Sequence, residues 1–149
     1  MRAMMRVTIL AAGVSAAMMV GGTAFAQAGN DITVMVEGLR NDQGVVRCGL
    51  YNSPNGFREP GKEFKGVEAK ISGGKANCTF TSVPPGTYAV ALFHAEHNET
   101  VLETGMFGIP KLGYGFTRDA KGSMGPPSFG AAAYTYAGGT STWPVKVQY

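Results

Sequence analysis

The sequence predicts an all-β protein, an antiparallel β-sandwich of about seven short strands with one long loop rich in glycine and aromatic residues. Apolar residues recur with a period of two along the chain, turn-forming residues separate these runs, and series of strong helix formers are rare. Glycine accounts for 22 of the 149 residues, which suits a chain with many tight reversals. A β-barrel is the alternative architecture for the same strands.

The N-terminal segment has the three parts of a secretory signal peptide. A basic start, Met1 to Arg6, precedes an apolar or small run over residues 7–20, and the segment ends in Ala24-Phe25-Ala26. A membrane-spanning helix needs about 20 apolar residues, so this shorter run favours a cleaved signal over a membrane anchor. We expect residues 1–26 to be removed, leaving one domain, residues 27–149, in the periplasm or outside the cell.

Alternation predicts four strands in the first half of the mature chain. Each has one apolar face, as a strand does when it covers a core on one side and meets water on the other. Asn41–Gly44 and Ser72–Gly74 supply the residues that tight turns require between them. The predicted strands are residues 32–37, 45–50, 67–72 and 76–81.

Three further strands are predicted after the turn Pro84-Pro85-Gly86. Tyr88 to Phe93 is apolar on both faces, which is typical of a central strand buried on two sides. Pro144 lacks the N–H that a strand ladder needs, so the last strand is expected to lie at a sheet edge or to start late. The predicted strands are residues 88–93, 132–137 and 142–149.

Cys48 and Cys78 are the two cysteines of the chain, and each falls in the middle of a predicted strand on its apolar face. An exported protein folds where disulfides persist, which favours a bond between them over two buried thiols. Neither cysteine has a neighbouring base or helix N-terminus that would activate it, so we expect no catalytic thiol.

The alternation fails between His94 and Gly130, where glycines alternate with aromatic and aliphatic residues. A structureless loop of this length is uncommon in a compact domain, and its apolar content argues against disorder. We expect a compact excursion that covers one end or face of the sandwich. Two interpretations are open: its aromatic residues seal the sandwich, or they form a binding surface.

The second interpretation gives six candidate ligand-binding residues. Aromatic rings would stack on a sugar, a peptide side chain or an acidic ligand, and basic side chains would anchor it. The stacking candidates are Tyr114, Phe116 and Phe129, and the anchoring candidates are Lys111, Arg118 and Lys121.

Both histidines of the chain lie close to three acids, directly after the predicted central strand. Imidazole and carboxylate groups are suitable zinc ligands, so this segment is a candidate metal site. In an extended chain, however, His97 faces away from His94 and Glu96, which favours a polar strand end without a metal. The candidate ligands are His94, Glu96, His97, Glu99 and Glu103.

Five segments of the chain carry a resemblance to a known family: residues 44–53, 56–57, 83–94, 107–116 and 125–129. They resemble a family of exported bacterial proteins, domain of unknown function 2141. The resemblance implies a transthyretin-like or immunoglobulin-like sandwich and no defined activity. Family members often carry a calcium-type loop after the central strand, but Ala95 and Thr100 stand here in place of its first Asp and its turn Gly, so no calcium site is carried over.

The net charge of the chain and its lack of catalytic motifs restrict the class of function that we expect. The formal net charge of +3 includes two arginines of the predicted signal peptide, and the mature chain has no basic run, which argues against a nucleic-acid partner. No arrangement of residues predicts a catalytic nucleophile or a cofactor. We therefore expect a non-enzymatic binding or accessory module of the bacterial envelope with an extracytoplasmic ligand or partner protein and no membrane span. The alternatives are a structural envelope protein and a metal-dependent enzyme at the His94 cluster.

Overall fold

The computed structural model describes residues 29–105 and 109–149, so the predicted signal peptide lies outside the described residues. This part of the chain forms strands, one 3₁₀ turn (η2, Thr117–Asp119) and one short helix (α1, Phe129–Ala132). None of its helices is long and apolar enough to cross a membrane. The strands are β1 (Ile32–Glu37), β2 (Val45–Tyr51), β3 (Lys65–Lys70), β4 (Ala76–Phe80), β5 (Gly86–Ala95), β6 (Tyr114–Phe116), β7 (Tyr134–Tyr136) and β8 (Ser141–Lys146).

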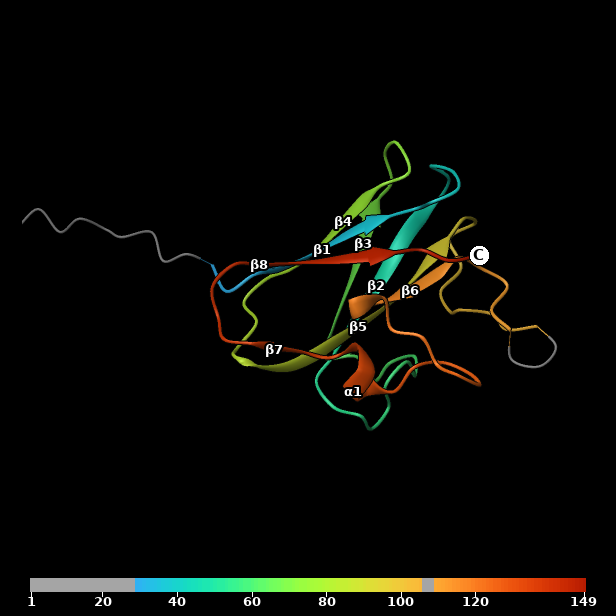
Figure 1. Cartoon of the computed structure of the whole chain (residues 1–149). Helices are drawn as coiled ribbons and strands as arrows, with labels where there is room; N and C mark the ends of the chain where they lie inside the picture. Colours follow the sequence, from blue (N-terminus) through green and yellow to red (C-terminus); the bar gives the residue numbers. More distant parts are fainter. Residues whose placement is uncertain (1–28, 106–108) are drawn as a thin grey trace, which may run out of the picture.

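The strands form two packed sheets, which confirms the predicted all-β sandwich (Figure 1). The smaller sheet has the order β4-β1-β8, and the larger has the order β3-β2-β5-β6, with β7 also paired to β5. Each strand of the smaller sheet alternates buried and exposed residues. In β5, by contrast, three successive residues, Tyr88 to Val90, are buried, as predicted for a central strand with a cover on both faces.

One pairing differs from the antiparallel expectation: β1 and β8 run parallel, with Val34 opposite Trp143. The chain reaches β8 from β7, which belongs to the other sheet, and so it crosses to the free edge of β1 instead of turning back in a hairpin. Pro144 lies opposite Met35 in this edge strand, where its missing N–H is tolerated.

The core lies between the sheets and is closed by a disulfide. Cys48 of β2 and Cys78 of β4 are bonded, with their Cα atoms 6.5 Å apart, so the bridge joins one sheet to the other. Both are almost fully buried, which confirms their predicted inward positions. The largest fully buried apolar side chains around them are Phe80, Ile32, Leu50, Val34, Val36 and Val46.

The predicted long loop contains a strand that the sequence pattern did not indicate. β6 pairs with β5, and Tyr114 also exchanges two backbone hydrogen bonds with Gln148, at 2.9 and 2.8 Å, which joins the two sheets along one side. Glycine permits this approach, because a Cβ at Gly115 would lie 2.6 Å from Cγ1 of Val145. Three residues with a central glycine are too few to show an alternating pattern.

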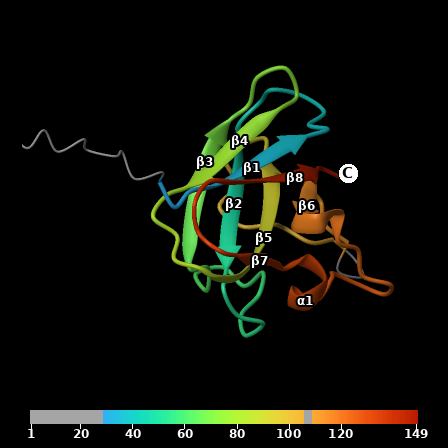
Figure 2. The same cartoon turned by 60° about the vertical axis from the view of Figure 1, so that its left-hand side comes forward.

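Other boundaries moved by a few residues. The third strand is 65–70 instead of 67–72, and the last is 141–146 instead of 142–149. The strand predicted over 132–137 begins later because the chain first forms α1, whose Ser128 hydroxyl accepts a hydrogen bond from the Ala131 N–H. In both views, α1 lies beside the connection from β2 to β3 (Figure 2).

Candidate ligand-binding cavity

The outward face of the larger sheet carries a row of small residues across three strands. Gly66 of β3 lies opposite Gly49 of β2, and Gly49 lies opposite Ala91 of β5. Phe116 of β6 ends the row. Since the middle of this row has no side chain larger than a methyl group, it forms a floor in which Gly66 is exposed and Gly49 and Ala91 are half-buried.

Larger side chains rise on both sides of this floor. Along β2, Arg47 and Tyr51 lie two residues before and after Gly49, so all three share the outward face. Their Cα atoms are four residue steps, about 13 Å, apart along the strand, which leaves a trough that the Tyr51 ring partly covers at Gly49. Phe93 of β5 lies opposite Arg47, and Tyr114 of β6 lies opposite Phe93, so these three residues form a row across the sheet.

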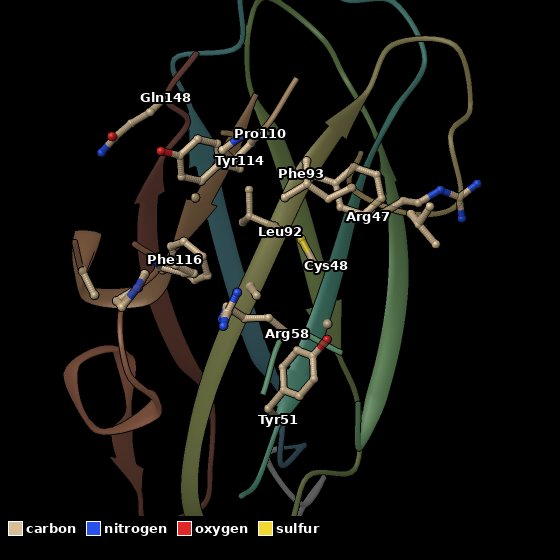
Figure 3. A pocket seen from close by; sticks show the side chains of 18 of the residues that line it. Arg47, Cys48, Tyr51, Arg58, Leu92, Phe93, Pro110, Tyr114, Phe116 and Gln148 are labelled. Carbon is tan, nitrogen blue, oxygen red and sulfur yellow. The ribbon is translucent and has the colours of Figure 1, made fainter. Parts of the chain in front are cut away.

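Three connections close the trough into a cavity with a volume of about 970 Å³ (Figure 3). They are the connection from β2 to β3, the connection from β5 to β6, and the connection from η2 to α1. Three of the side chains around it are exposed and apolar: Val101, Ile109 and Met124 are 43%, 63% and 100% exposed. A concave site of this size with an apolar rim is typical of a small-molecule site.

An aromatic cluster on the same face holds two of these connections together. Phe57, in the connection from β2 to β3, packs edge-to-face on Tyr51 at 5.3 Å and on Phe129 of α1 at 5.7 Å between ring centroids. It also contacts Phe116 at 6.1 Å. Because these rings are mostly buried against each other, they support the cavity wall and are not available to a ligand as a group.

The two arginines of the cavity differ in their partners. Arg47 forms an ion pair with Glu68 and donates a hydrogen bond of 2.7 Å from Nε to the Glu99 carbonyl, so it ties the β5–β6 connection to the sheet. Arg58 is exposed, and its Cζ lies 6.0 Å from the Phe57 ring centroid. Burial raises the pKa of Tyr51 to about 12, so its hydroxyl stays protonated beside them.

Comparison with known families now identifies the chain. Residues 34–143 match the family described as "Uncharacterized protein conserved in bacteria (DUF2141)". The chain belongs to this family. The match confirms the resemblance found in the sequence and spans the strands that build the cavity floor. No curated protein and no solved structure matches the chain significantly, so the choice between a transthyretin-like and an immunoglobulin-like sandwich stays a prediction.

In this DUF2141 member, three of the six predicted ligand-binding residues line the cavity: Tyr114, Phe116 and Lys121. The other three lie elsewhere. Phe129 is packed against Phe57, and Arg118 donates a hydrogen bond of 3.2 Å to the Ala133 carbonyl. Lys111 is exposed outside the lining.

The histidine segment forms a separate polar cluster at the end of β5. His94 is fully buried, with Nε2 2.7 Å from the Gln43 carbonyl and Nδ1 2.7 Å from the Tyr149 hydroxyl. Because a carbonyl only accepts, Nε2 donates to it, and Nδ1 accepts the hydrogen bond that the Tyr149 hydroxyl donates. Both ring nitrogens of His94 are therefore already engaged.

Glu96 is held in the same cluster by the loop between β1 and β2. Arg40 donates two hydrogen bonds to its carboxylate, at 2.6 and 2.5 Å, and the Asn41 amide donates a third at 2.7 Å. The Arg40 hydrogen bond is the main cause that lowers the pKa of Glu96 to about 2 from an ordinary 4.5. The Glu96 side chain is only 8% exposed, so this carboxylate serves as a tie between loops.

The remaining candidate metal ligands, His97, Glu99 and Glu103, lie outside this cluster. The side chain of His97 is 79% exposed and lies 3.3 Å from Glu99, while Glu103 is exposed on the β5–β6 connection. In the described residues, no three His, Cys, Asp or Glu side chains come together in a way that would hold a metal ion. The five residues are thus split between a hydrogen-bonded cluster and the surface.

Sequence reasoning missed the floor and one wall of the cavity. Gly49 and Ala91 fall in predicted strands and Gly66 lies just before one, but the pattern does not show that they form a floor, and it does not single out Tyr51 and Arg58. One signal was present: a glycine inside a strand, flanked two residues away by an arginine and a tyrosine, marks a place where a ligand can approach the backbone.

Proposed function

We propose that this protein is an exported, non-enzymatic binding protein of the bacterial envelope, which takes a small molecule into the cavity on its larger sheet. The observation that carries the proposal is the cavity of about 970 Å³ over a floor of Gly49, Gly66 and Ala91. The disulfide between the sheets supports the extracytoplasmic location, since such bonds persist in oxidising compartments.

The character of the lining supports binding. It offers aromatic rings, guanidinium groups and an apolar rim, which hold and orient a ligand. The two histidines lie outside it, one buried in the polar cluster and one on the surface.

The test is to place a bulky side chain on the cavity floor and to determine which ligands no longer bind. A Cβ at Gly66 would meet nothing closer than 3.7 Å, so Gly66→Leu fits the backbone and projects its side chain into the trough. Thr79→Leu on the exposed face of β4 is the matched control, because it adds an apolar side chain to a strand far from the cavity. Both proteins and the wild type, expressed as the full chain, are screened against a small-molecule library by thermal shift.

The expected result is that compounds which raise the melting temperature of the wild type and of Thr79→Leu fail to do so for Gly66→Leu. Compounds that stabilise all three proteins equally bind elsewhere and contradict the proposal. If no compound stabilises the wild type, the proposal fails and the structural envelope protein becomes the better interpretation.

A further inference from the structure

Arg58 projects into the cavity from a backbone conformation that few residues adopt. Its φ is 71°, in the left-handed region, where an L-residue other than glycine is uncommon and mildly strained. Figure 3 shows its side chain between Tyr51 and Phe116. The Phe57 ring next to it in the chain is fixed in the aromatic cluster, so the base of this side chain is anchored.

The guanidinium of Arg58 is uncommitted within the described residues. Arg40 is paired with Glu96 and Arg47 with Glu68, whereas no carboxylate in residues 29–105 and 109–149 pairs with Arg58. An arginine carries five N–H donors in a planar fork that matches the two oxygens of a carboxylate. A cation at the edge of a cavity with this geometry is suited to anchoring a carboxylate ligand.

The space beside Arg58 suits a flat apolar ring. Gly66, Gly49 and Ala91 place no side chain larger than a methyl group along the floor, which leaves room for a ring above it. Tyr51 and Phe116 are themselves buried in the aromatic cluster, so they bound this space without stacking on the ligand. The exposed apolar rim described above favours an apolar ligand body over a hydroxyl-rich sugar, whose hydroxyls would lose their hydration against it.

We propose that the cavity binds a small aromatic carboxylate, with its ring over the row of small residues and against the apolar rim, and its carboxylate held by the Arg58 guanidinium. This inference rests on the proposed function and names the ligand class of the same site. Arg58 makes the ionic contact, and the floor supplies the room for the ring.

The test compares 2-naphthoate with 2-naphthamide, which has the same shape without the charge, by isothermal titration calorimetry on the purified full chain. The wild type is expected to bind the naphthoate at least about tenfold more tightly, the scale of one charge-assisted contact. Arg58→Gln is expected to bind both probes equally. Lys75→Gln, which removes a positive charge in the β3–β4 turn outside the lining, should keep the wild-type preference.

Arg58→Gly separates loss of folding from loss of binding. Glycine accepts a positive φ without strain, so this variant should melt at or above the wild-type temperature and still lose the preference for naphthoate. Arg58→Lys keeps the charge without the fork, and we expect an intermediate preference.

Two results would overturn the inference. Equal binding of the two probes by the wild type would show that charge is not recognised, and a preference that survives in Arg58→Gln would place the carboxylate elsewhere. If neither probe binds while other compounds lose their thermal shift in Gly66→Leu, the ligand class is wrong and the binding function stands. If Gly66→Leu affects no ligand, both fail together.

Discussion

The polar cluster around His94 and the cavity around Gly49 are both rich in reactive residue types, but they differ in what is already paired. In the cluster, both His94 nitrogens and the Glu96 carboxylate have protein partners within 2.7 Å. In the cavity, by contrast, the Arg58 guanidinium is exposed and pairs with no carboxylate of the described residues. Polar residues that already pair with each other stabilise the fold, whereas unpaired ones beside a cavity are available to a ligand.

The aromatic side of the cavity lies at the opposite end of the strands from the His94 cluster. His94 and Glu96 are at the end of β5, beside the loop from β1 to β2. Tyr51 and the aromatic cluster are at the end of β2 and the start of β5, where the chain leaves the sheet toward Phe57. Four predictions test whether the His94 cluster stabilises the fold while cavity residues can be substituted with little loss of stability.

Loss of the disulfide should have the largest effect, because it fastens the strand that carries both Arg47 and Gly49 to the other sheet. For a bridge that spans 30 residues, the double variant Cys48→Ala/Cys78→Ala should lose about 3.5 kcal/mol of unfolding free energy. Urea denaturation of this variant and of the oxidised wild type measures the difference. A loss below about 1 kcal/mol would show that core packing alone joins the sheets.

His94→Ala should cost about 3 kcal/mol, since it opens a void in a fully buried site and leaves the Gln43 carbonyl and the Tyr149 hydroxyl without their partner. Arg58→Gln, at the exposed wall of the cavity, should change the unfolding free energy by less than about 0.5 kcal/mol. Chemical denaturation of both variants provides the comparison. Equal losses of unfolding free energy in the two variants would show that the two regions contribute equally to stability.

Acid should weaken the polar cluster. The folded pKa of Glu96 is about 2, below its ordinary 4.5, so its stabilisation is fully present above pH 4.5 and is lost as the pH falls toward 2. Asp42 adds to this loss, because the N–H groups of Gly74 and Gly73 lower its pKa. Glu96→Gln, which should cost about 1.5 kcal/mol at neutral pH, should flatten this part of the stability profile. An unchanged profile would remove Glu96 from the explanation.

Gly66→Thr should give a small effect of opposite sign. Threonine is a better strand former than glycine, and its Cβ finds ordinary contact distances at this position, so stability should rise by about 0.5 kcal/mol. Thermal denaturation checks the gain, and the thermal-shift compounds check the accompanying loss of binding. A destabilised variant would mean that the floor needs glycine for structure instead of for access.

Most of the sandwich could be predicted from sequence because its strands obey a period of two. β1 has the predicted boundaries, and Cys48 and Cys78 face the core as their positions indicated. β6 could not be predicted, since Gly115 replaces the apolar residue that would mark its inward face. The parallel pairing of β8 depends on where the chain crosses between sheets, which a local pattern does not encode.

The cavity was predictable only in part. Tyr114 and Phe116 drew attention as aromatic residues among glycines, and both line it, although they lie in a strand and not in a loop. Arg58 depends on a left-handed backbone and on three distant connections that meet over the sheet, which no residue spacing reveals. The histidine segment attracted attention by composition alone, and composition does not show whether a side chain is already paired.

The parallel pairing of β1 with β8 has a consequence for the order of folding. β1 completes its ladder only with β8, so the smaller sheet stays one strand short until β8 has been synthesised. Contacts between such distant parts of a chain are slow to form, because a long loop must close first. Until then Trp143 and Val145 are absent, and the edge of β1 is open to other chains. A chain truncated before Ser141 should therefore aggregate, and a chaperone that holds the nascent protein should matter more for its yield than for its final stability.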